Sequence, residues 1–160
     1  MPRPDEHQFL RYVLREDTAA IAAFKTISRV SQTLDDLIDK DRPVSDGDVI
    51  SAFWMIIVEL PANPFYRANE IYLRPLLASA LSDWRVSVAL ERDGDAHGRH
   101  LAFVLRDQLA GVLCQMAYLV GGEQWMNQVA VEIRRHVHED TLSEYITDLD
   151  SSYALNGDRA

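Results

Sequence analysis

Apolar residues recur along most of this chain at steps of three and four, the spacing of one face of an α-helix. The clearest case runs from Thr18 to about Asp39, with apolar residues at Ile21, Phe24, Ile27, Val30, Leu34, Leu37 and Ile38. Similar patterns predict helices over residues 5–16, 70–91 and 123–137, and the capping sequence Thr141-Leu-Ser-Glu144 predicts a last helix. No segment alternates with the two-residue period of a strand, so the predicted fold class is all-α.

Two further segments, residues 49–60 (VISAFWMIIVEL) and residues 100–120, are apolar on almost every side. A helix of that kind is normally buried. We therefore expect these two segments to form the centre of a bundle of six to eight helices. Gly121-Gly122 predicts the end of the second one, because glycine commonly follows the last residue of a helix. Its polar residues Arg106 and Asp107 make a membrane span costly, so we expect no membrane contact.

The length of 160 residues fits one domain, and 48% hydrophobic residues supply enough apolar surface for a core. We expect residues 1–160 to form a single helical domain whose tail frays from about residue 151. Cys114 is the only cysteine, and the N-terminal sequence lacks the apolar core of a signal peptide. Both features favour a cytoplasmic protein.

The formal net charge of −9 limits the classes of partner. A protein that binds duplex nucleic acid needs a basic face that displaces counterions from the phosphates, so no nucleic-acid partner is expected. An acidic chain favours solubility and can attract a basic partner. The expected partner is therefore another protein or a second copy of this chain.

Carboxylates gather where the helix over residues 18–39 is expected to end. Asp35, Asp36 and Asp39 form the pattern Asp-Asp-x-x-Asp, and Arg42-Pro43 follows it. At 100° per residue these aspartates lie opposite the apolar stripe, which indicates a solvated helix end. Ser45 and Asp48 are spaced almost as in a capping box, which explains further acids without a metal.

The same residues resemble the first aspartate-rich motif of the all-helical isoprenoid synthases. In that family the first and last aspartates bind Mg²⁺, which carries the diphosphate of the substrate. The resemblance implies that Asp35, Asp36 and Asp39 are the ligand and metal positions, that Arg42 contacts a diphosphate, and that the fold is similar to that of these enzymes. The second metal-binding motif of the family has no match after Val120. Without this site no cofactor is expected.

A second resemblance covers the whole chain. The segments LDDLIDKDRPVS, VELPANPFYRANEIYLRPLL, VGGEQW and VEIRRHVHED look similar to small helical proteins encoded in tailed-phage and prophage genomes. This resemblance implies a cytoplasmic accessory or interaction protein in an infected bacterium.

Charged residues within the expected core form a further candidate site. Glu59 is the one charge in residues 49–60, and Arg74 is a possible partner, since a buried carboxylate needs one. With Arg106 and Asp107 they make a possible buried polar cluster, which either pairs charges within the bundle or lines a polar cavity.

No catalytic residue can be assigned from motifs, because the Ser-His-Asp, Gly-x-Ser-x-Gly, Walker and Rossmann patterns are all absent. Two functions remain open. The favoured hypothesis is a non-catalytic helical bundle that acts by binding a protein or by self-association. The alternative is a Mg²⁺-dependent protein or enzyme that binds an isoprenoid diphosphate. The direction of the aspartates, toward solvent or into a cavity, separates the two hypotheses.

Overall fold

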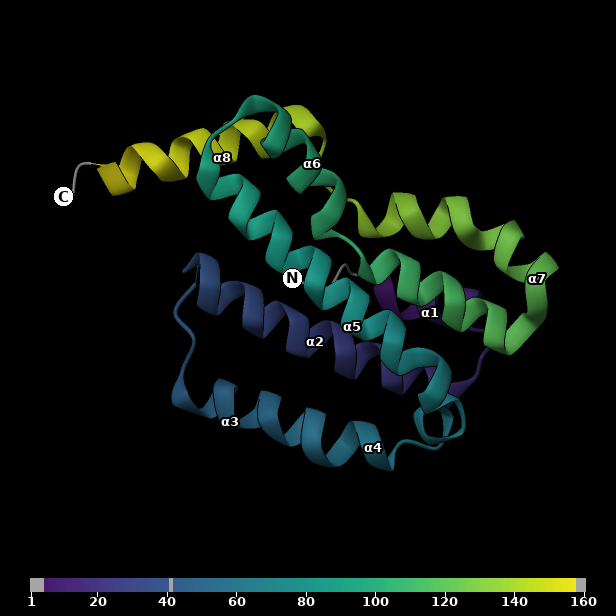
Figure 1. The fold of residues 1–160 in the computed structure, drawn as a ribbon. Coiled ribbons are helices and arrows are strands. Elements are labelled where there is room, and N and C mark those ends of the chain that lie inside the picture. The colour runs from purple at the N-terminus through teal and green to yellow at the C-terminus, as the bar shows by residue number, and fades with distance from the viewer. Residues whose placement is uncertain (1–4, 41, 158–160) are drawn as a thin grey trace. The chain divides into compact units, whose positions relative to one another are not determined.

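The computed structural model describes residues 5–40 and 42–157, and every regular element in this part of the chain is helical (Figure 1). The elements are α1 (Glu6–Val13), α2 (Thr18–Asp39), α3 (Asp46–Trp54), the π-helix η1 (Met55–Glu59), α4 (Leu60–Ala62), α5 (Pro64–Asp93), α6 (Ala96–Arg106), α7 (Leu109–Val137) and α8 (Leu142–Gly157). The predicted all-α class is confirmed. Joined across their short breaks, the described elements make five helices, so the predicted count of six to eight is not confirmed. α8 extends past the expected frayed point to Gly157, and residues 158–160 lie outside the described part.

Short side chains begin several of these helices by accepting backbone amides that have no partner inside the helix. The Asp17 carboxylate accepts the Ala20 amide at 2.9 Å at the start of α2. The side-chain oxygen of Asn63 accepts the Tyr66 amide at 3.0 Å at the start of α5. The Asn63 side-chain amide also donates to the Ala19 carbonyl at 2.9 Å, which ties the start of α5 to α2.

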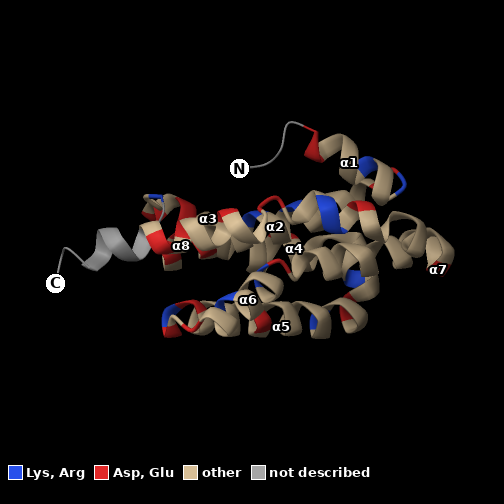
Figure 2. Cartoon of the chain, turned by 90° about the horizontal axis from the view of Figure 1, so that it is seen from above, with Lys and Arg blue, Asp and Glu red and all other residues tan. Residues whose placement is uncertain are grey.

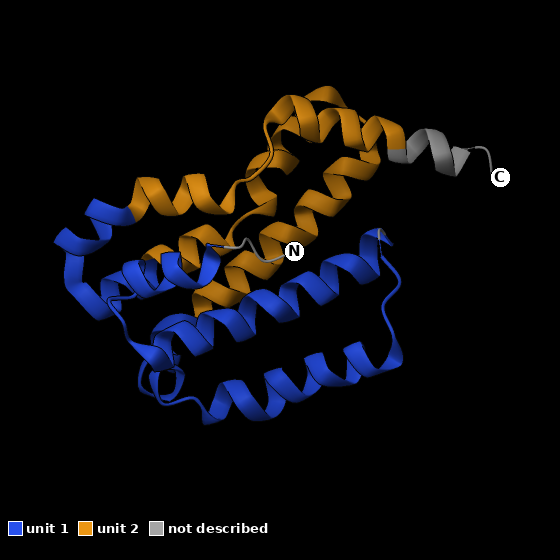
Figure 3. Ribbon diagram, turned by 180° about the vertical axis from the view of Figure 1, so that it is seen from behind, with its two compact units in different colours: residues 1–74, 115–129 blue, residues 75–114, 130–160 orange. Residues whose placement is uncertain are grey.

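The chain groups into two compact units, each built from two stretches of sequence (Figure 3). The first consists of residues 1–74 and 115–129, and the second of residues 75–114 and 130–160. α5 and α7 each contribute residues to both units. The expectation of a single domain stays a prediction.

In the first unit, α2 carries the core face and packs on α1, α3, η1 and α4. The apolar stripe predicted for α2 is buried at Ile21, Phe24 and Ile27, and it becomes exposed at Leu37 and Ile38 near the end of the helix. Other buried residues of this unit are Leu10, Val13, Leu14, Leu60, Phe65, Tyr66, Leu73, Met116, Ala117 and Val129. The apolar side chains of α2 thus become more exposed to solvent toward the acidic C-terminal end of the helix.

In the second unit, α6 packs on α8. Its buried residues are Ser87, Ala102, Ala110, Val112, Leu113, Cys114, Ile133 and Tyr145. The Ser87 hydroxyl is satisfied locally, since it donates to the Trp84 carbonyl at 2.7 Å. Burial raises the pKa of the Cys114 thiol, so this cysteine is held in its neutral, unreactive form.

Neither segment predicted as a central helix has the expected form. Residues 100–120 are split, because α6 ends at Arg106, Asp107 leaves helical geometry, and α7 begins at Leu109. The part after the break is largely buried, whereas Leu101 and Val104 before it are exposed. Residues 49–60 form α3, η1 and the start of α4, and most of their side chains are exposed.

Candidate functional site

The predicted aspartate motif lies at the C-terminal end of α2. Asp35 and Asp36 are half-buried and Asp39 is exposed, and Asp35 and Asp39 already take part in interactions within the chain. Lys40 ends the helix in a left-handed conformation and donates its amide to the Asp36 carbonyl. Among the described residues, no three His, Cys, Asp or Glu side chains gather closely enough to hold a metal ion. The three aspartates therefore do not form such a group, and Arg42 beyond them is exposed.

The acids that follow Pro43 serve the start of α3. The Ser45 hydroxyl accepts the Asp48 amide at 3.2 Å, and the Asp48 carboxylate accepts the Ser45 amide at 3.0 Å and its hydroxyl at 2.6 Å. This is a complete capping box, as predicted. The same bonds hold the pKa of Asp48 below its ordinary value, because they stabilise the ionised carboxylate. Thr141 and Glu144 form the second predicted box, with the same effect on the pKa of Glu144.

One side of the α3–η1 segment packs on α2. Its inner residues Val49, Ala52 and Met55 are half-buried, and Leu60 at the start of α4 is buried. α3 and η1 adjoin each other, and η1 adjoins α4. Beyond these contacts, the main helix that packs on α3 and η1 is α2. One neighbouring helix covers only one side, so a helix that is apolar all round leaves its opposite side in solvent.

Six large apolar residues of α3–η1 are exposed, and we call them the outer face: Ile50, Phe53, Trp54, Ile56, Ile57 and Val58. The four most exposed are Ile50 (69%), Phe53 (63%), Trp54 (58%) and Ile57 (65%). They stand at positions i, i+3, i+4 and i+7, which form one stripe along a helix. Taking about 200 Å² for a fully exposed residue of this size, the outer face leaves on the order of 700 Å² in water. A typical monomer has a largest apolar patch of about 300–600 Å².

The outer face is free of charge along its whole length. No Lys, Arg, Asp or Glu occurs from residue 49 to residue 58. Acids stand at both ends in the sequence, Asp46 and Asp48 before the stripe and Glu59 after it. Figure 2 shows all acidic residues of the described chain in red and all Lys and Arg in blue. Arg29 of α2 is close enough to Asp48 that its positive charge helps to lower the pKa of that carboxyl, after the larger effect of the hydrogen bonds from Ser45. The surface is thus an apolar strip with acidic ends.

The second half of the segment that carries the outer face is the π-helix η1. The Leu60 amide donates to the Met55 carbonyl five residues back, instead of four as in an α-helix. A turn of this kind is rare and frequently occurs at functional sites. Here it keeps Leu60 on the side that faces α2 while residues 56–58 stay outside.

The predicted buried polar cluster is not buried as expected. Glu59 is exposed, since η1 packs mainly on α2, and Arg74 is exposed and pairs with Glu70. Arg106 and Asp107 are half-buried in the second unit. The guanidinium of Arg106 lies 5.0 Å from the centre of the Tyr145 ring, and Asp107 contacts His138 at 3.1 Å.

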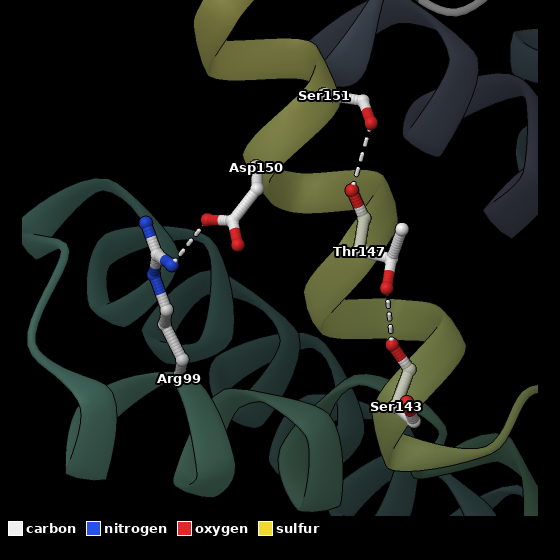
Figure 4. Close-up of polar contacts among 5 residues, drawn as sticks. All are labelled: Arg99, Ser143, Thr147, Asp150 and Ser151. Atoms are coloured by element: carbon white, nitrogen blue, oxygen red, sulfur yellow. Dashed lines mark hydrogen bonds and ion pairs between the residues drawn. The ribbon is translucent and has the colours of Figure 1, made fainter.

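These contacts belong to a set of polar links that hold α8 in the second unit. The Tyr145 hydroxyl donates to Glu91 at 2.5 Å, and Arg99 of α6 pairs with Asp150 of α8 at 2.7 Å (Figure 4). On the other side of α8, Thr147 and Ser151 donate their hydroxyls to carbonyls one turn earlier. The polar groups here serve to anchor one helix, so we read them as structural.

The corner after α1 is held by a residue of α7 that sequence reasoning missed. Trp125 of α7 donates its indole N–H to the Val13 carbonyl at 2.9 Å, meets Tyr12 edge-on at 5.5 Å, and lies 5.4 Å from the Arg15 guanidinium. Arg15 and Glu16 both have positive φ angles, which is uncommon outside glycine. Three contacts from one side chain hold this strained turn in place.

A cleft of about 580 Å³ lies beside this corner, within the first unit. Its lining residues are Leu14, Arg15, Asp17, Phe65, Asn69, Leu119 and Val120. Its polar groups already serve the fold: Asp17 caps α2, and the Asn69 side-chain amide donates to the Phe65 carbonyl. The cleft is wide open, so it is a weaker candidate than the outer face.

Comparisons with protein-family models, curated proteins and solved structures give no match for this chain. By length and composition alone, the joined helical stretch Ala96–Ser151 could cross a membrane, as could the bent pair Asp46–Ala62 and Pro64–Asp93 taken together, among the described residues. Core helices of water-soluble proteins meet the same criteria. The expectation of no membrane contact stays a prediction.

Proposed function

We propose that this chain is a non-catalytic helical accessory protein that acts by binding through the outer face of α3–η1. The observation that carries the proposal is the stripe of four large apolar side chains, more than half exposed, on a helix segment without charge. The resemblance to phage and prophage proteins supports an accessory role in an infected bacterium, in the cytoplasm.

The size of the outer face is sufficient for binding. At about 25 cal/mol per Å², covering roughly 700 Å² of apolar surface yields on the order of 15 kcal/mol before costs. Association itself costs an estimated 4–15 kcal/mol. A partner that covers the whole face can therefore be held across that range of costs, whereas one that covers half of it gains about 9 kcal/mol and is held only where association costs less than that.

A matched pair of isoleucine variants tests whether the face is free for binding. Ile57→Ala is expected to change the free energy of unfolding of the dissociated chain by less than about 0.5 kcal/mol, since surface substitutions are nearly neutral. Ile27→Ala, at a site only 5% exposed, is expected to cost about 2–5 kcal/mol through the cavity it leaves. Urea unfolding at two protein concentrations measures both.

If Ile57→Ala costs as much as Ile27→Ala at every protein concentration, the outer face is packed inside the chain itself. Binding through it would then be impossible, and the proposed function would be wrong.

The Mg²⁺-dependent isoprenoid-diphosphate function, with a synthase-like bundle of six to eight helices, is the alternative proposal. It is supported by the motif Asp35, Asp36, Asp39 and Arg42 alone. The exposure of Asp39 and the absence of a three-ligand group among the described residues give it less support than the outer face gives to binding.

Calorimetric titration with Mg²⁺ and a prenyl diphosphate is expected to give no saturable heat with either the natural chain or an Asp35→Asn/Asp39→Asn variant. The physical reason is that a hydrated Mg²⁺ needs several converging oxygens to exchange its waters, and the described aspartates do not converge. Saturable binding that the double substitution removes would instead establish the diphosphate site.

A further inference from the structure

We infer that the outer face of α3–η1 is covered by a second copy of this chain, in an antiparallel two-fold pair of these helix segments. The inference rests on the proposed function, because it names the partner for the same surface. It follows from the symmetry of the stripe and the area of the face, and the charges at its ends predict how the pair responds to salt.

The stripe is symmetric about its own midpoint. Its residues read Ile50, Phe53, Trp54 and Ile57, so that an aliphatic residue stands at each end and two aromatic residues stand at the centre. A two-fold axis between Phe53 and Trp54 places Ile50 against the partner copy's Ile57 and Phe53 against the partner copy's Trp54. Such self-complementarity is what an interface between identical copies requires. A different partner would not need this symmetry.

The centre of the pair would hold its strongest contacts. Large aromatic residues dominate binding energy when they lie at the middle of an interface, surrounded by side chains that exclude water. Phe53 and Trp54 have that position, and Ile50, Ile56, Ile57 and Val58 surround them along the helix. Eight residues of helix from Ile50 to Ile57 span about 12 Å, two turns that can face two turns of the partner.

The area also fits a dimer. With roughly 700 Å² covered on each copy, the pair would bury about 1,400 Å² in total, within the range of about 1,200–2,000 Å² for stable interfaces. A single peptide helix laid on the face would leave its own outer side in water. When a second copy binds, the outer faces of both chains are removed from water by the same contact.

The acids at the ends of the face predict how the pair responds to salt. The antiparallel arrangement brings Glu59 near the partner copy's Asp48, a pair of like charges that the nearby Arg29 only partly offsets. Both chains also carry a net charge of −9. Salt screens such repulsion, so the dimer should tighten as salt is added. A basic partner protein on the same face would bind more weakly in salt.

The first test is sedimentation velocity of the full chain at about 1 to 100 µM, a range that brackets micromolar dissociation constants. The natural chain is expected to dimerise. Ile57→Gln is expected to weaken the dimer by at least about tenfold, because the two-fold pair loses the apolar contact between Ile57 and the partner copy's Ile50 twice. Ile71→Gln is the matched control: Ile71 is 93% exposed but lies on α5, outside the face, and its substitution should leave the dimer unchanged.

The second test fixes the register by oxidative cross-linking in a Cys114→Ala background. A mixture of Ile50→Cys and Ile57→Cys chains is expected to form a disulfide-linked dimer, while either chain alone is not. Efficient cross-linking of Ile50→Cys with itself would mean a parallel arrangement and would overturn the antiparallel pair.

A natural chain that stays monomeric over the whole concentration range overturns the inference, as does a dimer that Ile71→Gln abolishes and Ile57→Gln leaves intact. A monomer that floats with phosphatidylcholine vesicles, and loses this property in Ile57→Gln, would assign the face to lipid instead. In these cases the stability of Ile57→Ala still decides the proposed function, so the two failures are distinguishable.

Discussion

Replacing Trp125 by alanine is expected to lower the free energy of unfolding by about 3–5 kcal/mol, the usual cost of truncating a packed aromatic side chain. The loss removes the indole hydrogen bond to the Val13 carbonyl, the edge-on contact with Tyr12 and the contact with Arg15 in one step. Thermal or urea unfolding measures it.

Two further tryptophan variants separate the causes. Trp125→Phe keeps a smaller aromatic ring and loses the N–H donor, so it should cost less than Trp125→Ala, with the lost hydrogen bond contributing about 0.5–1.5 kcal/mol. Trp54→Ala removes an equally large side chain from the outer face and should leave the stability of the dissociated chain nearly unchanged. Equal losses for Trp54→Ala and Trp125→Ala would contradict the assignment of one to a surface and the other to the fold.

The second large effect is expected at the glycine pair that precedes Trp125. A Cβ on Gly121 would lie 2.4 Å from the Trp125 ring, far inside contact distance, so Gly121→Ala should cost at least about 1–3 kcal/mol. Gly122 has φ 80° and ψ −179°, a conformation open essentially to glycine only, so Gly122→Ala should cost about 1–3 kcal/mol as well.

Gly47→Ala is the matched control for both changes. Its Cβ would meet only the Ser45 hydroxyl at 3.6 Å, an ordinary contact, and alanine favours the helix over glycine. The same substitution should therefore be neutral or stabilising there. Urea unfolding of the three variants side by side measures the difference, and a neutral Gly122→Ala would show that the bend in α7 is not required.

Local rules predicted the helix class and several helix starts from the sequence. The two capping boxes, at Ser45 and at Thr141, are predictable from the sequence because both partners lie within four residues of each other. The apolar stripe on α2 is predictable from the spacing of its residues, and the first half of this stripe is buried as predicted. These features depend on residues close together in sequence.

The exposure of residues 49–60 could not be predicted in this way. A helix that is apolar on all sides has the same pattern whether other helices of the chain or another molecule cover it. Residues 49–60 do not form a central helix and Glu59 is exposed, because α2 is the main helix that packs on this segment among the described residues. The apolar pattern shows how much of the surface of a helix favours burial. It does not show whether the same chain or another molecule buries that surface.

The other misses have similar causes. Arg106 and Asp107 were read as charges inside one helix, although a polar group at the middle of an apolar segment is equally a place for the chain to break. Gly121-Gly122 predicts the end of a helix, whereas α7 continues to Val137 with a kink at Gly122, the residue that leaves helical geometry. The contact of Trp125 with Val13 joins residues 112 positions apart, which no local pattern encodes.

The π-helix η1 has a consequence for how this segment can tolerate changes in length. A turn closed over five residues contains one residue more than a regular turn, so deleting a single residue from Met55–Glu59 would let residues 46–62 continue as one α-helix. The residues on either side of η1 would keep their angular positions, because the extra residue widens its turn and does not advance the helix. Leu60 would then bond to Met55 over four residues and stay on the side that faces α2, whereas a deletion in a regular turn of α3 would rotate everything beyond it by about 100° about the helix axis. This segment can thus lose one residue within η1 without turning its outer residues toward α2.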